Sequence, residues 1–208
     1  MIIFFIWMTN GRIFCAINIS TGGLMSKIDE SISVYKKINV LKDINRQGWV
    51  DREVPGRIES VAEHCFAMSN LAILINLQCN LNLDLAKMLT MINTHEYGEA
   101  KIGDITPKAK IKKEEKYNME LDAIVEILGN HTGRLSIIEL WKEFEAQQTD
   151  EAIFVMLLDK FQSVLQAREY AEKYNRIEVY DEFANYYIGL LEKKSQEKLP
   201  ESAKLLSL

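Results

Sequence analysis

Residues that turn or break the chain are scarce, with 3 prolines and 10 glycines among 208 residues. A many-turned β-sandwich and a disordered linker both need more of them, so long helices are favoured over either. Cysteine is scarce too: Cys15, Cys65 and Cys79 are odd in number and show no CxxC spacing. This excludes a disulfide framework and a zinc ribbon, and it is typical of a protein of the reducing cytoplasm.

Positive charge is in deficit, since 25 lysines and arginines face 30 acidic residues. The net charge of −5 and the pI of about 5.4 argue against a general binder of nucleic acid polymers, which needs a basic face. A local basic pocket for a small anion stays open. Residues 1–8 are nearly all apolar, but a membrane span needs about 20 such residues. No membrane partner is therefore expected.

The first 24 residues differ in composition from the rest and show neither the positive charge nor the cleavage site of a signal peptide. They are either an ordered edge segment or the product of a start codon placed too early, with the natural start at Met25. Gly22 and Gly23 lie just before Met25, as happens when a purine-rich ribosome-binding site is read as codons, and this favours the second interpretation. The sequence thus predicts an N-terminal extension over 1–24, one domain over 25–194 and a polar tail over 195–208.

From residue 25 on, apolar residues recur at helical spacing. Ser60 and Glu63 have the spacing of a capping box that opens a helix. The pattern predicts a non-helical link over 47–57 and helices over 26–45, from Ser60 onward, from about Asp84 to about Ala100, and over 111–128, 135–148, 150–174 and 177–194. The fold class that follows is all-α, with a single domain.

Several polar side chains occupy positions that the helical pattern reserves for apolar ones. His64 shares a helix face with Val61 and Met68, and Asp159 lies within the apolar stripe of the 150–174 helix. On the helix that starts near residue 84, the next two positions of the apolar stripe are the polar residues His95 and Glu99. Glu96 lies beside His95 on the same edge of the helix. Burying these groups without partners would exceed the net stability of a domain, so we expect them to share one.

A divalent cation would satisfy this cluster, because it neutralises carboxylates and takes lone pairs from imidazoles. Nitrogen and oxygen donors together suit Mn, Fe, Co, Ni or Zn. Taken singly, an inward histidine is more often a core residue, and an inward aspartate is usually a structural ion pair. His64, Asp159 and the adjacent pair His95-Glu96 come from three helices, and four such residues together favour a metal site.

The order His64, His95-Glu96, Asp159 resembles the H…HD…D metal signature of the HD-domain phosphohydrolases, with Glu96 in place of the second-motif aspartate. The likeness extends to blocks around these residues and covers about residues 28–185. Within the family, the blocks resemble the bacterial 5'-deoxynucleotidase subfamily; they span residues 46–50, 59–64, 99–107, 113–123, 140–145 and 158–167.

The resemblance implies an all-helical, metal-dependent phosphomonoesterase of the cytoplasm that acts on deoxyribonucleoside 5'-monophosphates, with a homodimer as its assembly. It also implies one divalent ion, which can be Co, Mn, Zn, Fe, Ni or Mg, held by His64, His95, Glu96 and Asp159. It further implies that Glu99 is the catalytic acid and that Asp104 is the motif aspartate near the attacking water and the sugar. Arg46 would bind the phosphate, and Trp49 would crowd a ribose 2'-hydroxyl.

The residues alone leave alternatives for these positions. Arg46 can be a solvated loop charge, Trp49 a core anchor, and Asp104 a cap of the turn before Pro107. His131, the third histidine, is either a ligand of a second metal or a surface residue, and the second is the commoner case for a histidine in a glycine-rich loop.

The departure at Glu96 leaves the activity open as well. Its extra methylene shifts the metal or the helix, and a displacement of about 1 Å at a catalytic centre costs on the order of 100-fold in rate. Besides a 5'-deoxynucleotidase, the sequence is compatible with an HD phosphohydrolase of a dNTP or another phosphoester. It is also compatible with a catalytically weakened protein that binds nucleotide and metal.

Overall fold

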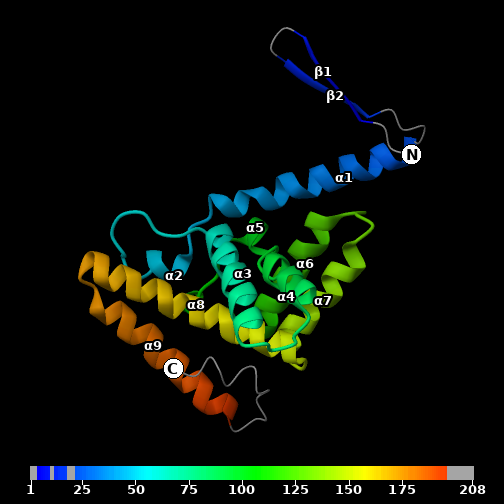
Figure 1. Ribbon diagram of the computed structural model, residues 1–208. Helices are drawn as coiled ribbons and strands as arrows, with labels where there is room; N and C mark the ends of the chain where they lie inside the picture. The colour runs from blue at the N-terminus through cyan, green and yellow to red at the C-terminus, as the bar shows by residue number, and fades with distance from the viewer. Residues whose placement is uncertain (1–3, 10–11, 18–21, 196–208) are drawn as a thin grey trace.

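Helices make up most of the described chain. The computed structural model describes residues 4–9, 12–17 and 22–195, and Figure 1 shows a group of packed helices preceded by a hairpin. The elements are β1 (Phe4–Thr9), β2 (Arg12–Ile17), α1 (Gly22–Ile38), α2 (Gln47–Val50), α3 (Val61–Gln78), α4 (Leu85–Thr94), α5 (Glu99–Ile102), α6 (Lys113–Leu128), α7 (Arg134–Ala146), α8 (Asp150–Tyr174) and α9 (Ile177–Ser195), with 3-10 turns over Asn39–Lys42 and Pro107–Ala109. The prediction of an all-α domain is confirmed.

The hairpin lies within the predicted extension. Strands β1 and β2 pair antiparallel, from Phe4 opposite Ile17 to Thr9 opposite Arg12. Helix α1 then begins at Gly22, so the predicted boundary at Met25 falls inside its first turn. The domain limits at 25 and 194, and the translation start at Met25, stay predictions. The polar tail predicted over 195–208 lies outside the described residues apart from its first residue.

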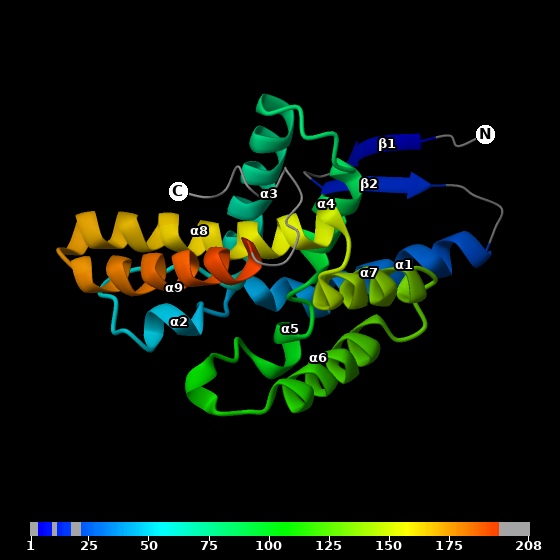
Figure 2. The same ribbon diagram turned by 90° about the horizontal axis from the view of Figure 1, so that it is seen from below.

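Helix α8 forms the centre of the domain and packs against α3, α4, α7 and α9. Figure 2 shows α9 running alongside α8 over most of its length. The core between α3, α4 and α8 contains fully buried side chains such as Met68, Met88, Ile92, Leu157 and Leu158. Burying each of them contributes about 1.5–3 kcal/mol, and together they fix the helices from which the polar residues project.

Two predicted boundaries are confirmed by capping contacts. Ser60 Oγ accepts from the backbone N–H of Glu63, and the Glu63 carboxylate accepts from the backbone N–H of Ser60. The helix of residues 150–174 has the predicted bounds, with Thr149 as its N-cap. No helix within residues 22–195 is long and apolar enough to cross a membrane.

Three predicted boundaries are wrong. The first long helix ends at Ile38 and continues as a 3-10 turn, and the link over 47–57 contains the short helix α2. The helix predicted to reach about residue 100 ends at Thr94, and α5 resumes at Glu99. At Gly98, between them, a Cβ would lie 3.1 Å from the Cα and carbonyl oxygen of Glu120, so the chain can turn there only because glycine lets it approach α6.

Candidate functional site

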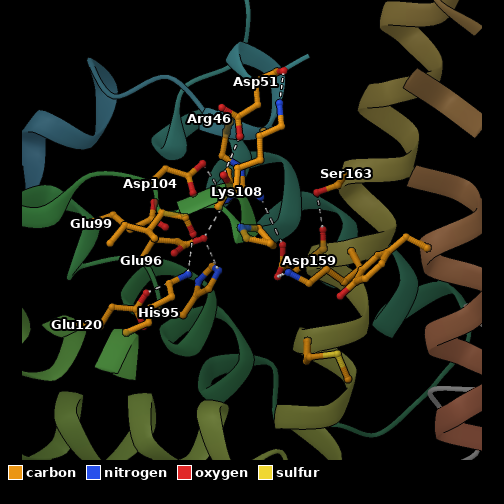
Figure 3. Close-up of a pocket in the computed structure, with 18 of the residues that line it drawn as sticks. Arg46, Asp51, His95, Glu96, Glu99, Asp104, Lys108, Glu120, Asp159 and Ser163 are labelled. Carbon is orange, nitrogen blue, oxygen red and sulfur yellow. Dashed lines mark hydrogen bonds and ion pairs between the residues drawn. The ribbon is translucent and has the colours of Figure 1, made fainter. Parts of the chain in front are cut away.

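Four of the polar residues predicted to point inward, His95, Glu96, Glu99 and Asp159, line a cavity of about 730 Å³, and His64 lies behind Asp159. Its floor comes from α8 and from the turn between α4 and α5, and its walls come from α2, α6, α9 and the segment 104–108. Figure 3 shows His95, Glu96, Glu99, Asp104 and Asp159 gathered around Arg46. The sequence pattern singled out His95, Glu96, Glu99 and Asp159 of this group, and the family resemblance added Arg46 and Asp104.

His64 lies in the second turn of α3, fully buried, and faces α8. Its Nε2 atom lies 3.2 Å from Oδ1 of Asp159. Its other ring nitrogen, Nδ1, forms a hydrogen bond of 2.6 Å with Oε1 of Gln162. Burial works to raise the pKa of Asp159, but the charges of Lys160 and Arg46 and the contact with His64 outweigh it and hold that pKa well below its usual range. Asp159 is therefore a carboxylate.

His95 is the first residue after α4. Its side chain is buried, and the side chain of Glu96 lies beside it. His95 Nδ1–H donates to the backbone carbonyl of Ile92 over 2.8 Å. A carbonyl oxygen only accepts, so Nδ1 carries the proton, and Nε2, 3.3 Å from Oε1 of Glu96, keeps its lone pair in the neutral ring. Ligand atoms of His64, His95 and Glu96 all lie within 4.8 Å of one another.

Arg46 bridges the carboxylates of the cavity. Its guanidinium lies 3.1 Å from Glu96 Oε1, 3.7 Å from Asp159 Oδ1 and 3.9 Å from Asp104 Oδ2. Burial works to lower the pKa of Arg46, but these carboxylates outweigh it and raise the pKa above its usual value. Arg46 is thus a buried cation of the site rather than a solvated loop charge.

Four buried polar atoms in or next to the cavity make no hydrogen bond. They are His64 Nε2, His95 Nε2, Asp159 Oδ1 and Glu99 Oε2. Buried polar atoms are rarely left this way, because each costs about 1–3 kcal/mol. Nitrogen and carboxylate lone pairs that face one another are satisfied by a divalent cation, so the residues present fit a metal of the kind that the sequence predicts.

Glu99 opens α5 and is nearly fully buried at the edge of this group. Burial is the largest cause of a pKa well above the usual glutamate range, and the charges of Glu96 and Asp104 raise it further. The surroundings of Glu99 in the cation-free protein thus favour its protonated form. A group that holds its proton in this way is suited to general acid chemistry.

The positions of Asp104 and Trp49 can be compared with the alternative roles that the sequence left open. Asp104 Oδ2 accepts from the backbone N–H of Gln47 over 2.8 Å, so it caps α2 rather than the turn before Pro107. Trp49 is 2% exposed and packs against Tyr170 and Phe183, as a core anchor does. It also lines the cavity, and its role toward a ribose 2'-hydroxyl stays a prediction.

Several residues of the site were not singled out from the sequence. Lys160 Nζ donates to Asp159 Oδ2 over 2.6 Å, and its place next to Asp159 in the chain was the only available signal. Glu120 on α6 lines the cavity, and burial raises its pKa to about 7. The third histidine, His131, lies away from the cavity, where its ring contacts Ser31 and the backbone N–H of Gly133.

An all-α domain whose buried imidazole and carboxylate groups turn free lone pairs toward one cavity has the arrangement of a metal-dependent hydrolase. Comparison with known proteins agrees, since the family model described as "HD domain" matches residues 38–203. The chain therefore belongs to the HD-domain family, as the resemblance of its motifs predicted.

Relatives narrow this assignment. The 5'-deoxynucleotidase HDDC2 of Dictyostelium discoideum is 35% identical over 156 residues, which are 71% of this chain and 80% of the relative. The protein of the same name from Homo sapiens is 39% identical over 143 residues, 68% of each chain. The solved structure of the PH0347 protein from Pyrococcus horikoshii has a TM-score of 0.68 at 24% identity, over 84% of this chain and 95% of that one, and it supports the fold.

Proposed function

We propose that this protein is a metal-dependent 5'-deoxynucleotidase, which removes the 5'-phosphate from deoxyribonucleoside 5'-monophosphates. The observation that carries the proposal is the group of buried, unbonded lone pairs of His64, His95 and Asp159 beside the cation Arg46. Relatives that share about a third of its residues are named 5'-deoxynucleotidases, which supports the same substrate class.

The proposed ligands of the cation are His64, His95, Glu96 and Asp159. A bound divalent cation supplies positive charge at a phosphoryl oxygen and lowers the pKa of a coordinated water. The mixed nitrogen and oxygen donors suit Mn, Co, Fe, Ni or Zn, and Mg is the remaining candidate. Glu96 has the charge of the aspartate that it replaces, so we expect the cation to be retained.

Arg46 binds the phosphate of the substrate in this proposal. Its planar guanidinium suits two-pronged contact with phosphate oxygens, and it already lies within 4 Å of three carboxylates of the site. With a cation bound to Glu96 and Asp159, those carboxylates are neutralised, and the guanidinium is free to pair with the phosphate instead.

Glu99 and Asp104 handle the proton and the water. Glu99 holds a proton that it can give to the leaving 5'-oxygen, because burial and its acidic neighbours keep its pKa high. Asp104, fixed by the N–H of Gln47 at the edge of the cavity, orients the attacking water and the sugar. Trp49 forms an apolar wall that leaves no partner for a ribose 2'-hydroxyl, which favours deoxyribose.

The compartment and the assembly belong to the same proposal. The three cysteines without CxxC spacing fit the reducing cytoplasm. The likeness to the subfamily suggests a homodimer, and sedimentation of the purified protein tests this directly.

The test of the function is phosphate release from matched deoxyribo- and ribonucleoside monophosphates after cation analysis of the purified protein. We expect release that depends on the cation and favours the deoxy substrates. Triphosphates belong in the same panel, because faster hydrolysis of a dNTP would point to another HD phosphohydrolase.

The variant Glu96→Asp decides between an enzyme and a weakened binding protein. A wild type that binds a cation but releases no phosphate from any nucleotide, while Glu96→Asp does so, would refute the proposed function. Comparable release by both would show that the longer side chain is tolerated.

A further inference from the structure

A chain of buried hydrogen bonds leads from the cation site to Trp49. Gln162 on α8 is 3% exposed, and Glu59, just before α3, is 6% exposed. His64 Nδ1 lies 2.6 Å from Gln162 Oε1, and Gln162 Nε2–H donates to Glu59 Oε2 over 3.1 Å. At the far end, Trp49 Nε1–H donates to Glu59 Oε1 over 2.9 Å. None of the roles proposed above involves Gln162 or Glu59.

The chemistry of the groups gives this chain one direction. A carboxylate only accepts hydrogen bonds and an indole N–H only donates, so Glu59 takes a proton donor at each of its oxygens. The amide of Gln162 must therefore turn its NH₂ group toward Glu59 and its oxygen toward His64. That oxygen requires a proton on Nδ1 of His64, and the neutral ring then keeps the lone pair on Nε2.

We propose that Glu59 and Gln162 are positioning residues that fix the tautomer of His64, so that its Nε2 lone pair faces the cation site. The inference rests on the proposed function in taking His64 as a ligand. It explains why Nε2 of His64 and Oδ1 of Asp159, two acceptors, lie 3.2 Å apart without a hydrogen bond. Outer partners that orient a ligand histidine are worth about 10–100-fold in metal affinity.

The comparison with His95 supports this role. His95 obtains the same tautomer from the backbone carbonyl of Ile92, which lies one helical turn before it. His64 lies in α3, and its Nδ1 faces α8 across the core, so a side chain from α8 has to supply the acceptor. The amide of Gln162 could in principle turn over and donate to His64 Nδ1. The buried carboxylate of Glu59 prevents this, because it needs the NH₂ group of Gln162 as a donor.

The variant Glu59→Gln tests the direction of the chain without breaking it. The introduced amide accepts from Trp49 through its oxygen and offers its NH₂ group to Gln162. The Gln162 amide then turns over and donates to Nδ1 of His64, which moves the ring proton to Nε2. Every hydrogen bond is kept, so we expect a folded protein with the opposite His64 tautomer and an affinity for Mn²⁺ that is about 10–100-fold weaker.

The double variant Glu59→Gln with Gln162→Glu is the rescue. It places an acceptor-only carboxylate next to His64 Nδ1–H, while the amide at position 59 still bridges to Trp49. We expect the original tautomer and Mn²⁺ affinity to return. The matched control is Glu169→Gln, which removes an exposed carboxylate of the same helix α8 and should change neither quantity.

The measurements are nitrogen-15 NMR of the histidine rings in cation-free protein and calorimetric titration with Mn²⁺. The chain has only three histidines, and His131→Asn assigns one of them. A folded Glu59→Gln protein that keeps the proton on Nδ1 of His64 would overturn the proposal, and so would a double variant that keeps the inverted tautomer. If the wild type binds neither Mn²⁺ nor any of the other proposed cations, the proposed function fails, while the ring spectra still decide the tautomer.

Discussion

Replacing Arg46 by methionine removes the one charge that contacts three carboxylates of the cavity while keeping most of the side-chain volume. Opposite unit charges 3–4 Å apart attract by about 4–5 kcal/mol at an effective dielectric constant of about 20. Arg46 lies 3.1 Å from Glu96, 3.7 Å from Asp159 and 3.9 Å from Asp104. Burial of the guanidinium cancels much of this attraction, and removing one partner of a buried pair costs about 3–5 kcal/mol net.

For a chain of this length, 1 kcal/mol changes the melting temperature by about 2–4 °C, so Arg46→Met should lower it by about 6–20 °C in cation-free buffer. The same variant removes a positive charge that competes with the divalent ion. The affinity for Mn²⁺ should therefore rise by about tenfold or more, although phosphate release is lost. Added Mn²⁺ should raise the melting temperature of the variant more than that of the wild type.

The assay is thermal unfolding by circular dichroism with and without Mn²⁺, paired with calorimetric titration. Arg168→Met is the control, since it breaks an exposed ion pair with Glu172 and should change the melting temperature little. An unchanged melting temperature for Arg46→Met, together with weaker binding of Mn²⁺, would refute the electrostatic role given to Arg46.

Three further outcomes are expected. Glu120→Gln should raise the free energy of unfolding, measured with urea, by up to about 3 kcal/mol above pH 7 and should not change it at pH 4. The reason is that Glu120 has a pKa of about 7 in the folded protein, so the native form holds a proton that the unfolded chain loses from about pH 4.5 upward. Equal effects at both pH values would contradict this. Trp49→Phe should lower the free energy of unfolding by about 1–3 kcal/mol, because it leaves Glu59 Oε1 without its donor. The same variant should lower the ratio of turnover on deoxyribonucleotides to turnover on ribonucleotides. Asp159→Asn should weaken Mn²⁺ binding measured by calorimetry, and Mn²⁺ should restore the phosphate release that a chelator abolishes in the wild type; an unaffected Mn²⁺ affinity would remove Asp159 from the ligand set.

The sequence predicted the fold where local signals act within one helix. The Ser60–Glu63 box and the apolar stripe of residues 150–174 are such signals, and both are confirmed. The break after Thr94 was missed because helical spacing continues from Ile92 through His95 to Glu99, across the interruption. At this break Gly98 approaches the backbone of Glu120 on another helix, a contact that no local pattern contains.

The site was predicted to the extent that a buried polar residue contradicts its apolar face. His64, His95, Glu99 and Asp159 do so; the last three line one cavity, and His64 is buried next to Asp159. Arg46 precedes the four-residue helix α2, which is too short to show any periodicity, so only the family resemblance singled it out. Its position depends on Asp104, which caps α2 from 57 residues further along the chain.

The contact between Gly98 and Glu120 has a consequence for redesign of the substrate range. A Cβ at residue 98 would lie 3.1 Å from the backbone of Glu120, so α6 packs closely against the turn that leads into α5 and Glu99. We therefore expect substitutions that displace α6 to disturb the position of Glu99. Phe183 and Tyr186 on α9 line the other side of the cavity, and substitutions there can change its shape while leaving the proton donor where it is.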